Sequence, residues 1–584
     1  MKKNGHSTPE RKNGTVYTPE KLSQYVAKKL LEYALNDNLF RNLKKISVVD
    51  PASGDGILLK NVAENILQQK LLMGKKIIVV GTDIDQQAII FCRKRLSLIS
   101  NDRLNIELVN TNAFIPLKEY SLTKGWQGIL KKVDVKKGFD LLIANPPWGA
   151  DISEYKDKLN LSDFKTLQGQ FDSFELFIEL AIKIVKTGGY FGFIIPDSIL
   201  NHGKSILRGI LLKRTQICFI ARLGEKIFPN VNRACVVIIC KNTSPTEKNI
   251  VDCFRLSSKD RNKILNGMLT FTEAETTSAH KVPQERFIKN SYQRFDIDLK
   301  ESETNILKKF KKFDKTLASV LSSTRGVELG RSGMICQCNN CSSWSPLSEQ
   351  EKIICSSCGK EFNPTTAPKK SIISKDKIQL SVPFITGGNL RRYVGRPSLW
   401  IKLGVKGINY KPESTYKSPK ILVRKTGVGI TAILDYNDVY TNQVVYILKN
   451  IPEKEKNLEF FIGLINSRAY YFYLVKSFGE LEWKSHPYLT QTQILSLPLP
   501  DMQSEKNKKI IQEIIELLRP ILKKEIIPSN DVDIKVEILV GKLFSLNEKD
   551  YRIIFNAIEE SDDLIPVMEL KKITVSDIIN KLKK

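Results

Sequence analysis

The sequence predicts an α/β, doubly wound fold for residues 1–245, because two apolar patterns alternate there. Short apolar runs of strand length are separated by segments whose apolar residues recur at i, i+3, i+4 and i+7, the spacing of helices. This alternation is typical of a parallel sheet covered on both faces. The seven predicted strands are Ile46–Asp50, Ile77–Thr82, Ile106–Asn110, Phe139–Ala144, Tyr190–Pro196, Ile217–Leu223 and Ala234–Cys240. The last two have no clear helix between them and are expected to form a hairpin.

Three amphipathic helices are predicted in this domain, at Ile57–Leu72, Gln86–Leu98 and Ser173–Lys186, and a further helical motif at 15–40. Past residue 245 the pattern changes, and four further regions are expected. They are a linker leading into a second region at 246–330, a Cys-rich insert at 331–365, a mixed α/β region rich in aromatic and β-branched residues at 376–500, and a helical tail at 501–584. The amphipathic stripe of the tail is expected to break at Pro520.

Composition narrows the range of partners. The 584 residues include 91 Lys+Arg and 63 Asp+Glu, a formal charge of +28, and the surplus lies upstream of the nearly neutral tail. This charge favours a polyanionic partner.

No apolar run approaches the ~18 residues of a membrane span, and the N-terminus has no apolar secretory core. The expected location is therefore the cytoplasm, where the ten cysteines would be reduced or bound to metal.

A glycine-containing turn follows the first predicted strand, in the run VVDPASGDGILL. Asp50 ends the strand, and Gly54 and Gly56 let the backbone approach a bound group closely. Asp83, at the end of the next strand, is suited to the hydroxyl pair of a ribose. The turn lacks the Gly-Lys-Ser/Thr of a phosphate loop, and Asp50 and Asp55 would repel a pyrophosphate. A cationic nucleoside cofactor without phosphates fits better, and S-adenosylmethionine is the obvious one.

The fourth predicted strand ends in Asn145-Pro146-Pro147-Trp148, at the sheet edge where open α/β sheets bind ligands. The two prolines restrict the backbone, so the Asn145 side chain and the Pro146 carbonyl form a rigid pair of acceptors. Two acceptors directed at one amino group would hold it and turn its lone pair toward a methyl donor. Trp148 offers a flat face on which an extruded base could stack.

Cys338-x2-Cys341 and Cys355-x2-Cys358 have the spacing of a zinc ribbon. Four thiolates at this spacing suit a tetrahedral Zn²⁺, and a site closed by four cysteines would fold the insert rather than catalyse. Cys336 is a further nearby thiol that could replace Cys338.

These motifs resemble those of the TaqI-like, gamma-class adenine-N6 DNA methyltransferases. The resemblance rests on Tyr17-Thr18-Pro19, Asp50–Gly56, Asp83, NPPW at 145–148, FDSFELF at 171–177 and Ile227-Phe228-Pro229. It implies a class I S-adenosylmethionine-dependent methyltransferase fold for the first domain. A looser similarity, through VPFITGGNLRRY and later runs, implies a TaqI-type target-recognition domain at 376–500.

The resemblance also implies site roles. The residues expected to bind the cofactor are Tyr17, Thr18, Pro19, Asp50, Ala52, Ser53, Gly54, Gly56, Asp83, Ile84, Asn112, Ala113, Asn145 and Phe177. Asn112 stands where the family has an acid, and its amide oxygen would accept a weaker bond from the cofactor adenine. Asn145, Pro146, Pro147 and Trp148 would be catalytic, and Trp148 and Phe228 would stack on the target base. Arg391, Arg392, Arg424 and Lys425 would contact DNA.

The implied function is methylation of adenine N6 in duplex DNA by S-adenosylmethionine, in a nucleoid-associated prokaryotic enzyme of a restriction-modification or related defence system. A separate restriction endonuclease or defence subunit is a candidate partner. N4-cytosine methylation is an alternative with the same chemistry, and a protein-glutamine methyltransferase would leave the region after 245 unexplained. A combined restriction-modification enzyme, which would also cut DNA, is a third alternative. The one Glu-x-Lys triplet worth noting downstream for such a nuclease is Glu482-Trp483-Lys484.

Overall fold

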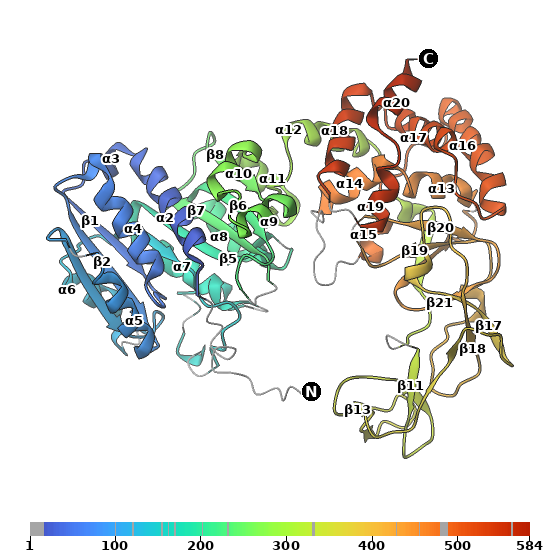
Figure 1. Cartoon of the computed structure of the whole chain (residues 1–584), viewed down its shortest axis with the longest axis horizontal. Coiled ribbons are helices and arrows are strands. Elements are labelled where there is room, and N and C mark those ends of the chain that lie inside the picture. The colour runs from blue at the N-terminus through green and yellow to red at the C-terminus, as the bar shows by residue number, and fades with distance from the viewer. Residues whose placement is uncertain are drawn as a thin grey trace. The chain divides into compact units, whose positions relative to one another are not determined.

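The computed structural model divides the chain into two compact units, residues 1–300 and 301–584 (Figure 1). It describes residues 17–99, 101–118, 122–153, 156–159, 161, 163–168, 171–200, 202–229, 233–329, 333–427, 429–454, 456–478, 489–561 and 564–583. The triplet at 482–484 lies outside these residues. Within them, no helix is both long enough and apolar enough to cross a membrane.

The first unit is built on one nine-stranded sheet with the order β3-β2-β1-β4-β5-β7-β6-β8-β9. Its strands are β1 (Lys45–Asp50), β2 (Lys76–Asp83), β3 (Leu104–Asn110), β4 (Phe139–Ala144), β5 (Val185–Pro196), β6 (Gln216–Gly224), β7 (Cys235–Lys241), β8 (Ile250–Arg255) and β9 (His280–Pro283). Strands β1 to β5 pair in parallel, and β7 is antiparallel to both β5 and β6. The α/β class, the seven predicted strands and the terminal hairpin are confirmed.

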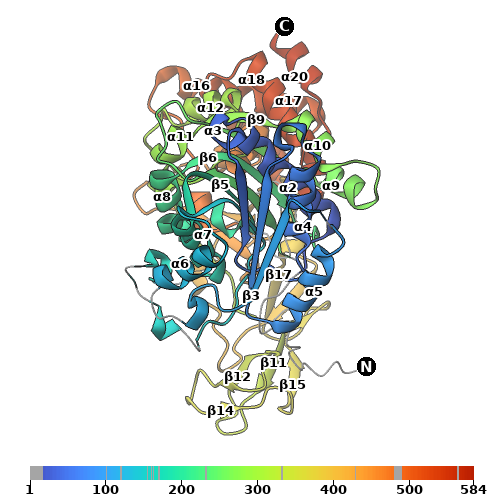
Figure 2. The ribbon, with the colours of Figure 1, turned by 90° about the vertical axis from the view of Figure 1, so that its left-hand side faces the viewer.

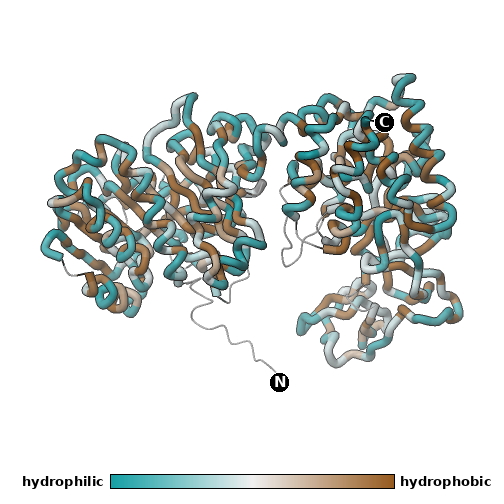
Figure 3. The backbone as a smooth tube through the Cα atoms, turned by 45° about the horizontal axis from the view of Figure 1, so that its top comes forward, coloured by the Kyte–Doolittle hydropathy of each residue, from teal (hydrophilic) through white to brown (hydrophobic). Residues whose placement is uncertain are grey.

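Helices cover both faces of this sheet. They are α2 (Glu20–Leu35), α3 (Asn38–Arg41), α4 (Ile57–Gln68), α5 (Gln86–Leu96), α6 (Leu122–Lys132), α7 (Ser173–Ile184), α8 (Ser205–Arg214), α9 (Ser258–Leu265), α10 (Phe271–Ser278) and α11 (Gln284–Lys289). In Figure 2, α2, α4 and α5 lie on one side of the sheet and α6, α7 and α8 on the other. In Figure 3, hydrophobic stretches of the backbone lie mostly in the interior and hydrophilic stretches mostly on the outside, as apolar burial requires.

Strands β8 and β9 lie in the segment that the sequence predicted to be a linker. β8 pairs in parallel with β6, and β9 pairs antiparallel with β8. Val251 and Phe254 of β8 are fully buried, so this short run completes the core of the first unit rather than leaving it. The compact unit accordingly extends to residue 300 instead of 245.

The second unit contains several small sheets, and its helices lie mostly toward the C-terminus. A four-stranded sheet has the order β10-β22-β19-β20 and another the order β16-β18-β17-β21. Their strands are β10 (Leu321–Arg325), β16 (Ile373–Ser374), β17 (Ser381–Ile385), β18 (Leu399–Lys402), β19 (Lys420–Arg424), β20 (Ala432–Asp435), β21 (Tyr440–Thr441) and β22 (Val445–Asn450). The Cys-rich insert adds β11 (Met334–Gln337), β12 (Trp344–Pro346), β13 (Ile353–Ile354), β14 (Glu361–Phe362) and β15 (Lys369–Ser371).

The helices of the second unit are α12 (Glu301–Phe310), α13 (Leu458–Ile465), α14 (Arg468–Phe478), α15 (Gln491–Leu495), α16 (Glu505–Lys523), α17 (Asn530–Leu543), α18 (Glu548–Glu559), α19 (Ile565–Leu570) and α20 (Val575–Leu582). The expected break at Pro520 is wrong, since α16 continues through it to Lys523. Pro520 lies in the last turn, where its missing N–H removes only one helical hydrogen bond. Burial of Ile514 and Leu518 on one face holds the helix in place.

Candidate active site and metal centre

A cavity of about 530 Å³ opens at the carboxyl ends of the first unit's parallel strands. It lies where the strand order reverses between β1 and β4, the place where open α/β sheets bind ligands. Of the residues predicted to bind a cofactor, all except Pro19 and Gly56 line it. The lining residues from that set are Tyr17, Thr18, Asp50, Ala52, Ser53, Gly54, Asp83, Ile84, Asn112, Ala113, Asn145 and Phe177.

Carboxylates give this cavity its electrostatic character. Asp50 accepts the N–H of Ala52 at 2.9 Å, and Asp83 accepts the N–H of Gly54 at 2.8 Å. Burial raises the pKa of Asp50 well above its usual range, and the charges of Asp83 and Asp55 raise it further. Burial also raises the pKa of Asp83, although backbone N–H groups oppose the shift. A cation bound here would relieve this repulsion, whereas a pyrophosphate would increase it.

The glycine turn lets the backbone bend around the cavity. Gly54 and Gly56 have φ angles of +51° and +80°, which L side chains rarely adopt. A Cβ at Gly56 would also lie 2.5 Å from the Cys92 sulfur. Gly56 therefore supports the turn through close packing with α5, although it does not line the cavity.

Aromatic residues form another part of the wall. Phe114 packs on Phe177 with ring centroids 4.6 Å apart. The Asn112 side-chain oxygen accepts the Phe114 N–H at 2.9 Å, so one of its two acceptor positions is already used. Phe114 lines the cavity, but sequence reasoning missed it because the motif directs attention to the polar residue two positions earlier.

Asn145 is connected to the N-terminal motif. Its Nδ2 donates to the Thr18 hydroxyl at 3.1 Å, across a separation of 127 residues. This bond turns the carboxamide oxygen away from Thr18. It joins two motifs that the sequence places far apart, and both residues line the same cavity.

The start of α7 holds the loop after Asn145 through three hydrogen bonds. The Ser173 hydroxyl donates to the Pro147 carbonyl at 2.6 Å and accepts the Ala150 N–H at 3.2 Å. The Asp172 carboxylate accepts the Gly149 N–H at 2.7 Å. These bonds reduce the freedom of the loop that carries the predicted catalytic residues.

Trp148 and Phe228 lie together, as the resemblance implied, but in direct contact with each other. Their ring centroids are 5.2 Å apart and the rings are nearly perpendicular, at 84°. A base stacked between two parallel rings needs a centroid separation of about 7 Å, so this edge-to-face pair has to open before a base can enter. The Arg233 guanidinium lies 6.0 Å from the Trp148 ring centre and donates to Asp172 at 2.7 Å. Nothing in the sequence singled out Arg233.

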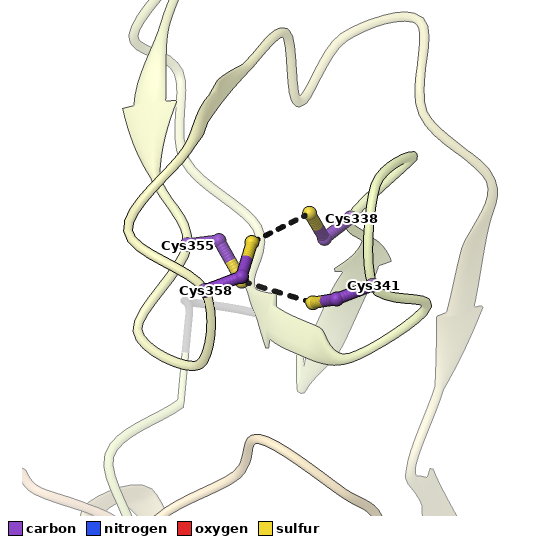
Figure 4. A group of neighbouring side chains, drawn as sticks. All are labelled: Cys338, Cys341, Cys355 and Cys358. Atoms are coloured by element: carbon purple, nitrogen blue, oxygen red, sulfur yellow. Dashed lines mark hydrogen bonds between the residues drawn. The ribbon is translucent and has the colours of Figure 1, made fainter.

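In the second unit, Cys338, Cys341, Cys355 and Cys358 come together with all four sulfurs within 4.8 Å of one another (Figure 4). The Cys338–Cys358 and Cys341–Cys355 sulfur pairs are 3.8 Å and 3.6 Å apart. A tetrahedral zinc with Zn–S bonds of about 2.3 Å requires sulfur separations of about 3.8 Å, so the geometry fits this metal. Cys336 is buried in β11 outside the group, with its sulfur 3.6 Å from the Ser345 carbonyl oxygen.

The four residues predicted to contact DNA divide into two kinds. Arg391, Arg424 and Lys425 are partly exposed. Burial lowers the pKa of Arg424, and the nearby Arg391 charge lowers it further, so an anion would stabilise this pair. Arg392 does not fit the prediction, because it is 9% exposed and donates from both terminal nitrogens to Asp533. Adjacent sequence positions could not reveal that one arginine points into the protein.

Comparisons with known proteins agree with this architecture. Residues 78–228 match the family model described as Eco57I restriction-modification methylase, and residues 382–499 match the TaqI-like C-terminal specificity domain. The chain is 25% identical over 255 residues to the type II methyltransferase M.VspI of Vibrio sp. (strain 343), covering 43% of this chain and 53% of that protein. It is 31% identical over 102 residues to the type II restriction enzyme and methyltransferase RM.Eco57I of Escherichia coli, and this match covers 16% of this chain and 10% of that protein. The chain thus spans about half the length of M.VspI and a tenth of RM.Eco57I.

Among solved structures, the type IIL restriction-modification enzyme MmeI, solved in complex with DNA, is similar at a TM-score of 0.53 and 14% identity. The match covers 97% of this chain and 80% of that one. The sheet order and the acidic cavity define a class I S-adenosylmethionine-dependent methyltransferase fold. More particularly, the chain carries an Eco57I-type restriction-modification methylase domain followed by a TaqI-like specificity domain.

Proposed function

We propose that this protein is a site-specific DNA methyltransferase that moves a methyl group from S-adenosylmethionine to N6 of an adenine drawn out of duplex DNA. One observation carries the proposal: Asn145 and Pro147 of the NPPW loop line the same cavity as the carboxylates Asp50 and Asp83. A methyl donor held by the acids would therefore lie beside the acceptors that hold the target amino group. The formal charge of +28 and the two matched domains support DNA as the substrate.

S-adenosylmethionine, when bound, supplies a methyl group that passes from its sulfonium sulfur to the target nitrogen in one in-line step. Asp50 and Asp83 would hold its cationic and ribose parts, and Phe114 and Phe177 would pack against its adenine. The Asn145 side-chain oxygen and the Pro146 carbonyl would accept hydrogen bonds from the two N6–H groups and orient the nitrogen lone pair toward the methyl group. Asn145 and Pro146 would hold the nitrogen in line while its new bond to the methyl carbon replaces the S–C bond, and the displaced proton would leave to water.

The target base would enter between Trp148 and Phe228, whose rings touch in the structure. Their contact with each other would be exchanged for contacts with the base. Stacking on both faces would offset an unstacking cost of a few kcal/mol in the duplex. When no base is present, the two rings remain buried against each other.

We propose that the four-cysteine group holds a structural Zn²⁺ and that Arg391, Arg424 and Lys425 contact DNA. The closed set of thiolates leaves no position for a substrate, so the metal would stabilise the insert. We place the protein in a restriction-modification or related defence system, with a separate endonuclease as a candidate partner. N4-cytosine methylation remains the alternative, because the same acceptors would hold a cytosine amino group.

Modification-sensitive sequencing of DNA from cells that express the protein tests the proposal. The expected result is N6-methyladenine in one short sequence motif and its loss in Asn145→Ala. Lys132→Ala is a matched control, because Lys132 pairs with Glu107 on the surface of the same unit at 2.7 Å. Methylcytosine in place of methyladenine would select the alternative. Unmodified DNA, or modification that survives in Asn145→Ala, would refute the proposed function.

A further inference from the structure

Four lysines lie within nine residues at the end of the Cys-rich insert and just after it: Lys369, Lys370, Lys375 and Lys377. All four side chains are exposed, and we call them the lysine ridge. They lie before the segment that matches the specificity domain, which begins at residue 382. Neither the proposed active site nor the four-cysteine group uses them.

The ridge follows the edges of two sheets. β15, which contains Lys369 and Lys370, is an edge strand of the β12-β11-β15 sheet. β16, which ends just before Lys375, is an edge strand of the β16-β18-β17-β21 sheet. An extended segment of this length spans at most about 26 Å, which is comparable to several successive phosphates along a DNA strand.

Tryptophans position two of the ridge lysines. The Lys370 ammonium nitrogen lies 3.9 Å from the Trp344 ring centre, and the Lys377 nitrogen lies 5.4 Å from the Trp400 ring centre. Both distances are within the range of a cation–π contact. The contacts restrain long side chains before any ligand binds, which reduces the entropy that binding would cost. The ammonium groups still have N–H donors available for an anion.

The charge of the ridge is not neutralised by ion pairs. Within the described part of the chain, no carboxylate pairs with any of the four lysines. Lys352 of the insert, in contrast, pairs with Glu361 at 3.4 Å. Asp376 is the one acidic residue inside the ridge, so the segment keeps a surplus of positive charge.

We propose that the lysine ridge binds the phosphates of duplex DNA and holds the backbone independently of base sequence. The inference rests on the proposed function only in taking DNA as the substrate. Lysine ammonium groups bind phosphates as point charges and read no base edges, so their contribution should be equal on every duplex. The insert and its adjoining sheet would thereby add affinity, while the specificity domain adds selectivity.

The test compares two variants with the same change in charge. In one, Lys369, Lys370, Lys375 and Lys377 are all replaced by Gln. In the matched control, four exposed lysines of α16 are replaced by Gln, namely Lys506, Lys508, Lys509 and Lys523. Binding to fluorescent duplexes with and without the methylated motif is measured by anisotropy over a series of salt concentrations.

The ridge variant should bind both duplexes at least about tenfold more weakly near 0.1 M salt, and its slope of log K against log [salt] should be shallower by about 2 to 4. The control should change affinity less than about twofold, and a ridge variant with four arginines should bind like the wild type. Equal zinc content and thermal stability would show that the ridge variant is folded.

Three outcomes would overturn the proposal. If the DNA affinity of the ridge variant is unchanged, the lysines would instead serve to keep the exposed sheet edges from pairing with other chains. An equal loss in the control would assign the effect to net charge. A loss confined to the motif-containing duplex would assign the lysines to base recognition. If the wild-type protein methylates DNA and the ridge variant binds DNA normally, only the proposed role of the lysine ridge is refuted. Wild-type protein that never methylates would refute the proposed function and leave the binding comparison valid.

Discussion

Arg233 and Asp172 form an ion pair of 2.7 Å that joins the two walls of the proposed base site. Arg233 belongs to the connection between β6 and β7 that also carries Phe228. Asp172 precedes α7 and accepts the N–H of Gly149, next to Trp148. The ion pair therefore connects the segment that carries Phe228 to the loop that carries Trp148.

Arg233→Ala should lower kcat by about 10- to 100-fold, because a loop displaced by about 1 Å loses much of its catalytic alignment. The Arg233 side chain is 42% exposed, so the loss of the pair should cost at most about 1 kcal/mol of stability. Fluorescence of 2-aminopurine at the target position should report a less stably extruded base. Lys132→Ala, which removes another surface ion pair, should change neither kcat nor the fluorescence of 2-aminopurine. Normal turnover in Arg233→Ala would show that the pair is not needed to hold the walls.

Cofactor affinity should depend on pH through Asp83. Burial raises the pKa of this carboxyl, so the folded chain retains its proton to a higher pH than the unfolded chain does. Stability of the ligand-free protein should therefore fall as pH rises from the ordinary carboxyl pKa of about 4 through the raised value. S-adenosylmethionine favours the ionised form, so its affinity should fall as pH is lowered through the same window. Calorimetry in buffers of different ionisation enthalpy should detect proton release on binding. Affinity that does not vary with pH would contradict this.

Cys355→Ser should lose the bound zinc and make the insert at 333–371 sensitive to proteases, because a tetrahedral site cannot close with three thiolates. Cofactor binding to the first unit should persist. Cys336→Ala is the matched control: this sulfur lies outside the group of four, so zinc should remain bound. Metal analysis of the purified variants decides between these results. A wild-type protein free of zinc would refute the metal site.

Two adjacent arginines should behave differently when truncated. Arg392→Ala leaves Asp533 buried with one partner fewer, and removal of one partner of a buried pair costs about 3–5 kcal/mol. Arg391→Ala should leave stability almost unchanged and weaken DNA binding, since this side chain is partly exposed. Denaturant unfolding and the salt dependence of DNA affinity measure the two effects. The reverse pattern would mean that the burial of Arg392 is not maintained in solution.

The sequence alone determined the features that depend on local patterns. The Gly turn, the NPPW run and the cysteine spacing each act within a few residues, so they could be read without a structure. The alternation of strands and helices likewise predicted the α/β fold, because burial on both faces imposes it.

Only the tertiary structure decided the long-range relationships. The Asn145–Thr18 bond spans 127 residues, and the Arg233–Asp172 bond spans 61. The burial of Arg392 depends on Asp533, which is 141 positions away. The extension of the sheet by β8 and the continuation of α16 through Pro520 depend on apolar surfaces supplied by other elements. No short window of sequence contains both partners of such contacts, so local pattern could propose the chemistry but not the framework that positions it.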